Sequence, residues 1–122
     1  MHKHPAIPSF RLVVVLLAVL WLSLSPTPLP DPKIARMLHP FDHVLLHAGL
    51  AVVCLTEWPR HFYGVLAGLI AAAIGLELFQ AILPVRAFEI GDLLANLAGV
   101  ALGAALFGIL SVVNSRVFKR GA

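Results

Sequence analysis

The stretch from Glu77 to Gly103 reads E-L-F-Q-A-I-L-P-V-R-A-F-E-I-G-D-L-L-A-N-L-A-G-V-A-L-G, and it joins two long apolar segments through a short polar connection. Polar residues recur within both segments at helical spacing. On a helix that advances about 100° per residue, four residues after the connection fall within about 60° of one another. They are Asp92, Asn96, Gly99 and Gly103. A face that is polar at its start and small further along predicts a helix that packs on a neighbour or lines a site.

The order and spacing of these polar and small residues resemble the VanZ-like family of small membrane proteins. Four patterns carry the resemblance: Glu77-x-x-Gln80, Pro84-x-Arg86, Asp92-x-x-x-Asn96 and Gly99-x-x-x-Gly103. Upstream, the family shows an Asp-Lys pair with a His four residues after the Asp; here His43 follows Asp42, and His47 lies five residues after it. The family takes its name from a protein linked to low-level teicoplanin resistance. The resemblance implies a small integral membrane protein but brings no established reaction.

The composition is that of a membrane protein. Of 122 residues, 60% are hydrophobic and 12% are charged, with a mean hydropathy of +0.94. Soluble domains average about 45–50% apolar and about 25% charged residues. The chain is also too short for two domains. We therefore expect residues 1–122 to form one all-α domain, a polytopic membrane protein with a four-helix transmembrane bundle, its helices lying near residues 10–25, 41–56, 62–83 and 90–113.

Charge and cysteine content exclude two further classes. The formal net charge is +3, but the basic residues form no patch interleaved with aromatic residues, so we expect no nucleic-acid partner. Cys54 is the only cysteine, so no disulfide can form within the chain, and we interpret it as a small packing residue.

The chain before residue 41 contains an apolar run and a proline-rich segment. A basic start followed by the run Leu12–Leu24 describes either a first helix or a signal peptide. We favour a retained helix, because Pro26 would obstruct cleavage after the small residues that precede it. Residues 26–40 carry closely spaced prolines and are predicted to form a semi-rigid connector, with at most one interfacial helical turn near residues 34–38.

Lysine and arginine positions predict the orientation. Cytoplasmic loops of membrane proteins carry an excess of these residues. We expect the chain to lie in a bacterial cytoplasmic membrane with both termini on the cytoplasmic side. Six basic residues then lie inside (Lys3, Arg11, Arg60, Arg116, Lys119 and Arg120) and three lie outside (Lys33, Arg36 and Arg86). The connection after Pro84 is then extracytoplasmic.

Polar groups on three expected helices lie at matching depths. At about 1.5 Å per residue, Glu77 lies roughly 10 Å, and His47 and Asn96 each roughly 9 Å, below the outer ends of their helices. We expect a ligand-binding layer here, although Asn96 and Gln80 are equally suited to locking helices together. The candidate ligand-binding residues are Asp42, His43, His47, Glu77, Gln80, Arg86, Asp92 and Asn96.

Two further features of the expected helices are their spaced glycines and a pair of histidines. Close approach of helices is expected at four glycines, Gly64, Gly68, Gly99 and Gly103, with the third helix at the centre of the bundle. His43 and His47, spaced four apart, could bind a metal or bond within the bundle. No acidic or cysteine motif completes a ligand set nearby in the chain, so we expect neither a metal site nor a cofactor.

Three functions remain open. We favour a non-enzymatic protein that binds an anionic membrane lipid or lipid-linked envelope intermediate, with Arg86 at its phosphate. A link to glycopeptide susceptibility would follow from the family name. The second is an intramembrane enzyme with Glu77 or His47 as general base, although the chain has no G-x-S-x-G motif. The third is a structural partner subunit, in a homo-oligomer or a larger membrane complex.

Overall fold

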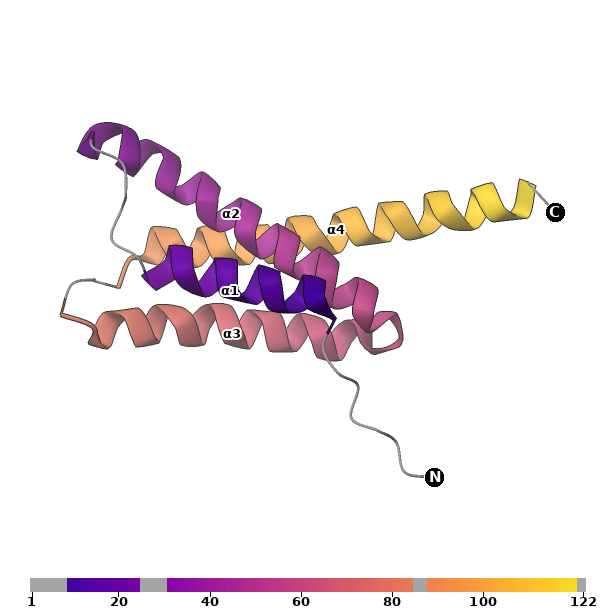
Figure 1. The fold of residues 1–122 in the computed structure, drawn as a ribbon, viewed down its shortest axis with the longest axis horizontal. Coiled ribbons are helices and arrows are strands. Elements are labelled where there is room, and N and C mark those ends of the chain that lie inside the picture. The colour runs from indigo at the N-terminus through magenta and orange to yellow at the C-terminus, as the bar shows by residue number, and fades with distance from the viewer. Residues whose placement is uncertain (1–8, 25–30, 85–87, 121–122) are drawn as a thin grey trace, which may run out of the picture.

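The computed structural model describes residues 9–24, 31–84 and 88–120, and the regular structure of these residues is helical throughout. Successive long helices run in alternating directions, so the start of the first and the end of the last lie at the same end of the bundle (Figure 1). The elements are α1 (Phe10–Leu24), α2 (Pro32–Glu57), the short 3-10 helix η1 (Pro59–His61), α3 (Phe62–Ile82) and α4 (Ile90–Arg120).

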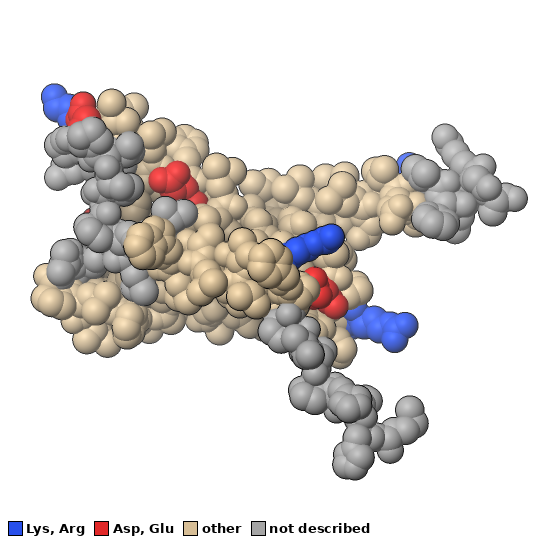
Figure 2. All heavy atoms as spheres, viewed as in Figure 1, with Lys and Arg blue, Asp and Glu red and all other residues tan. Residues whose placement is uncertain are grey.

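Three segments are long and apolar enough to cross a membrane: Met37–Glu57, Pro59–Ile82 and Ile90–Arg116. Helix α1 has 15 residues and therefore spans about 22 Å, less than the roughly 30 Å of a hydrocarbon core. On the face drawn in Figure 2, the acidic and basic side chains form two separate groups, and the surface between the groups shows neither. The prediction of an all-α, four-helix membrane protein is confirmed, with α1 as a shorter apolar helix.

Helix α2 begins earlier than its sequence predicts. Asp31 caps it by accepting a 2.8 Å hydrogen bond from the Lys33 backbone N–H, and Pro32 occupies the first turn, where its missing donor costs nothing. The helix then continues through Pro40, which lacks the N–H that would bond the carbonyl four residues earlier. The prediction of a connector up to residue 40 is therefore wrong from Pro32 onward. Residues 26–30 of that prediction lie outside the described residues.

Helix α2 is the centre of the bundle, because it contacts α1, α3 and α4, and its longest contact is with α4. The prediction that the third helix is central is wrong. Only Leu69, Ala73, Glu77 and Gln80 of α3 are buried, and most of its other residues are exposed. Helix α4 also continues to Arg120 rather than ending near residue 113. The apolar core is contributed by all four helices and includes Leu12, Val19, Leu50, Ala51, Cys54, Leu69 and Val100.

Two glycines let α4 lie directly against the backbone of α2. A Cβ atom at Gly99 would lie 2.5 Å from the Val44 carbonyl oxygen, and one at Gly103 would lie 2.5 Å from the Ala48 carbonyl oxygen. Real Cβ atoms do not approach a backbone this closely, so only glycine fits. Gly64 and Gly68 lie at open positions instead, where a Cβ would meet nothing within 4 Å. Within this chain they do not provide the predicted close approach.

The orientation in the membrane is a prediction that labelling can test. In a Cys54→Ser background, we expect Glu89→Cys to react with an impermeant maleimide in intact cells, and His61→Cys to react only after lysis. Both residues are exposed, so a difference in labelling between them would not come from burial in the protein. They lie on either side of α3 in the chain and therefore report on opposite faces of the membrane. Labelling of His61→Cys in intact cells, with Glu89→Cys protected, would reverse the orientation.

Candidate functional site

Among the side chains that the structure describes, six polar ones are buried within the bundle, and they come from α2, α3 and α4. Burying a polar group in an apolar environment costs several kcal/mol unless it is hydrogen-bonded. Such groups therefore occur in networks. The six, with the exposed fraction of each residue, are His43 (3%), His47 (3%), Glu77 (0%), Gln80 (1%), Asp92 (7%) and Asn96 (0%).

Asn96 joins the three helices. Its Nδ2 donates to Glu77 Oε1 over 3.2 Å, and its Oδ1 lies 2.6 Å from His43 Nδ1. Turning the amide round would place its oxygen against an oxygen of Glu77, and both would be acceptors when this carboxyl is ionised. The oxygen therefore faces His43, and because an amide oxygen only accepts, His43 Nδ1 carries the proton. Both hydrogen bonds therefore have a defined donor: Asn96 donates to Glu77, and His43 donates to Asn96.

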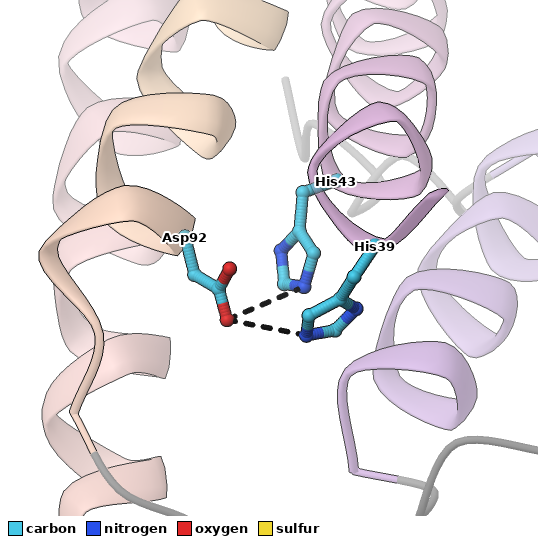
Figure 3. Close-up of side chains that lie close together, drawn as sticks. All are labelled: His39, His43 and Asp92. Atoms are coloured by element: carbon cyan, nitrogen blue, oxygen red, sulfur yellow. Dashed lines mark ion pairs between the residues drawn. The ribbon is translucent and has the colours of Figure 1, made fainter. Parts of the chain in front are cut away.

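The network continues toward the end of the bundle at Asp92 and His39. Both His39 and His43 point their Nε2 atoms at Asp92 Oδ2, at 3.2 Å and 3.9 Å (Figure 3). The His39 and His43 rings meet edge to face with centroids 4.6 Å apart. The His39 side chain is 22% exposed, so the buried network reaches the surface here.

Close packing of α2 and α4 sets this geometry. Gly99 lies three residues after Asn96, and a Cβ on it would also collide with His47 Cβ at 2.8 Å. Because glycine has no Cβ, the two helices lie near enough for Asn96 to reach His43. The glycine face and the polar face identified in the sequence thus act together.

The family comparison covers all four helices. The model of the VanZ/LLP1 family matches residues 10–111, which include every residue of the network described above. The chain belongs to the VanZ/LLP1 family. No curated protein and no solved structure matches it significantly. The resemblance read from the stretch after Glu77 is confirmed.

The remaining candidate residues take different places in this VanZ/LLP1 protein. His47 Nδ1 donates to the His43 backbone carbonyl over 3.0 Å, and the two rings lie parallel with centroids 6.3 Å apart. Gln80 is buried on α3, one turn beyond Glu77. Asp42 is exposed on α2. Arg86 lies outside the described residues.

His39 was missed in the sequence, although a signal for it exists. His39, His43 and His47 follow one another at intervals of four, which places all three on one face of a helix. That pattern becomes visible only if the helix is continued through Pro40. Prolines are tolerated within membrane helices, because neighbouring groups can satisfy the freed carbonyl.

Proposed function

We propose that this VanZ/LLP1 protein binds the polar headgroup of an anionic envelope lipid or lipid-linked intermediate, at the end of the bundle where α2 and α4 begin. The observation that carries the proposal is the polar chain that runs from buried Glu77 through Asn96 and His43 to Asp92 and partly exposed His39. Helix locking requires only the buried part of this chain. The outer pair, His39 and Asp92, lies where the network reaches the surface, so a polar headgroup can meet it.

The surroundings of the network suit a lipid. Phe41, Ile90 and Leu94 are each at least 60% exposed and lie within two residues of a network member on α2 or α4. Acyl or prenyl chains would lie along such apolar surface. The headgroup would meet His39 and Asp92, and Arg86 would offer its planar guanidinium to a phosphate. A protein that holds an envelope intermediate in this way would change its presentation and hence glycopeptide susceptibility.

An intramembrane enzyme is the second candidate, because a histidine beside a carboxylate suits general acid–base chemistry. The nucleophile would then be water or the substrate itself. Ser111 and Ser115 lie in the distal part of α4, where each hydroxyl donates to a carbonyl of its own helix. Conversion of a bound lipid by the purified protein would favour this candidate over simple binding.

A structural subunit is the third candidate. The exposed glycines Gly64 and Gly68 leave one face of α3 open to lipid or to a partner helix. The oligomeric mass of the purified protein in detergent, compared with that of Gly68→Leu, distinguishes these two. A complex that dissociates in the variant would support assembly through α3.

The proposed binding is tested by lipid retention. We expect delipidated protein to retain a polyprenyl phosphate in native mass spectrometry and not to retain phosphatidylcholine. Arg86→Lys keeps the charge but loses the two-pronged contact, so we expect retention to fall about tenfold, the equivalent of about 1.4 kcal/mol. Arg60→Lys, near the opposite end of the bundle, serves as the matched control. Equal retention by all three proteins would remove Arg86 from the site, and no retention by the wild type would refute the proposed function.

A further inference from the structure

We propose that His39, His43 and Asp92 form a binding site for a divalent transition-metal ion. One ligand atom from each residue lies within 4.8 Å of the other two, and the nitrogen–oxygen separations are 3.2 Å and 3.9 Å. In a tetrahedral zinc site with bonds of about 2.0–2.1 Å, neighbouring ligand atoms lie roughly 3.3 Å apart. Small rotamer adjustments would bring the three atoms to that spacing. All three side chains converge on one point (Figure 3).

The contacts of His43 suit a metal ligand. Its Nδ1 donates to the Asn96 oxygen over 2.6 Å, which leaves Nε2 as the ring nitrogen directed at Asp92 Oδ2, at 3.9 Å. At this separation the two atoms form no direct hydrogen bond. A metal ion coordinated by both would bridge them.

The inner part of the network has the form of an outer shell for a metal ligand. Metal-binding histidines donate their second ring N–H to a carbonyl or carboxylate, which fixes the tautomer and orients the ring. Asn96 takes this role for His43, and Glu77 orients Asn96 in turn. This arrangement orients the His43 ring so that its Nε2 is directed at Asp92.

Two imidazoles and one carboxylate favour a first-row transition metal such as Zn²⁺ over Mg²⁺ or Ca²⁺, which prefer oxygen ligands. Three protein ligands leave a coordination position open. The partly exposed His39 provides a path from the membrane surface. Metal binding does not depend on the proposed lipid, but a bound divalent ion would give the site a net positive charge and offer the open position to a phosphate oxygen.

The site is tested by titrating the purified protein with Zn²⁺ in isothermal calorimetry. The full chain is purified without a polyhistidine tag. His2 and His4 are replaced by glutamine, because imidazoles near the N-terminus would bind Zn²⁺ in competition with the site. We expect one Zn²⁺ per chain with a Kd of about 1 μM or tighter. His39→Gln and Asp92→Asn should each weaken binding at least about tenfold. His61→Gln, an exposed histidine in η1, should leave binding unchanged.

A cobalt spectrum keeps the test decisive if the variants misfold. Co²⁺ bound at the site should show the intense visible absorption of a four-coordinate ion, and Zn²⁺ should abolish it by displacement. Absence of Zn²⁺ binding to the wild type would overturn the proposal. So would equal binding by wild type, His39→Gln and Asp92→Asn, or a Co²⁺ spectrum identical to that of the hydrated ion.

Discussion

Replacing Gly103 by leucine should lower the free energy of unfolding by at least about 3 kcal/mol. A Cβ at this position would lie 2.5 Å from the Ala48 carbonyl oxygen and 2.6 Å from Ala51 Cβ. Neither atom belongs to the flexible end of a side chain, so the helices themselves must separate. Separation would also withdraw Asn96 from His43, because both contacts lie on the same faces of α2 and α4.

Gly108→Leu provides the control, since it adds the same side chain to the same helix. A Cβ at Gly108 would meet nothing within 4 Å. Leucine also has a better helix propensity than glycine, by about 0.8–1 kcal/mol. We therefore expect this variant to be as stable as the wild type or slightly more stable. Reversible unfolding in mixed micelles measures both, and equal stability of the two variants would show that α2 and α4 do not meet closely at Gly103.

Most of the fold could be predicted from the sequence because apolar periodicity is local. The three long helices and the shorter α1 follow from run length and composition, and the Gly99–Gly103 face follows from spacing. The start of α2 could not be predicted in this way. Closely spaced prolines predict the end of a helix, whereas Pro32 occupies a first helical turn and Pro40 is accommodated within a membrane helix.

The candidate site was predictable in its residues but not in its pairings. Depth along each helix placed Glu77 and Asn96 at one level, and the structure joins them by a hydrogen bond. Depth does not determine how far a helix is rotated about its axis. The choice between His43 and His47 is instead one of position along the axis, because the two residues lie on one face of α2, one turn apart. Depth counted from a helix start near residue 41 placed His47 level with Asn96, whereas α2 begins at Pro32 and it is His43 that reaches Asn96.

The sequence does not indicate the metal site proposed above, because its three residues are not close together along the chain. A completing acidic ligand was sought near His43 and His47 along the chain. Asp92 comes instead from α4, and His39 comes from the turn of α2 that was assigned to the connector. Ligands supplied by separate helices leave no compact sequence motif, so only the packing of the bundle brings them together.

The largest functional effect should come from Glu77→Gln, which hardly changes the shape of the side chain. Glu77 Oε1 accepts from Asn96, and this contact directs the Asn96 oxygen toward His43. A glutamine can donate as well as accept, so Asn96 is free to turn round and His43 Nδ1 no longer has to donate. Substitutions that disturb the partner of a metal or ligand residue weaken binding about 10–100-fold.

The stability of the same variant should change little. Glutamine preserves the volume of the side chain, and its amide oxygen can still accept from Asn96 Nδ2. We therefore expect the unfolding free energy to stay within about 1 kcal/mol of the wild-type value. A purely architectural network would leave lipid binding untouched under these conditions.

The most direct measurement is polyprenyl phosphate retention by Glu77→Gln, made beside its unfolding free energy. Glu57→Gln, an exposed residue at the far end of α2, is the matched control. We expect retention to fall at least about tenfold in Glu77→Gln while stability holds, and both quantities to stay unchanged in Glu57→Gln. Wild-type retention by stable Glu77→Gln, or a loss no larger than the loss of folded protein, would contradict a ligand-binding role for the network.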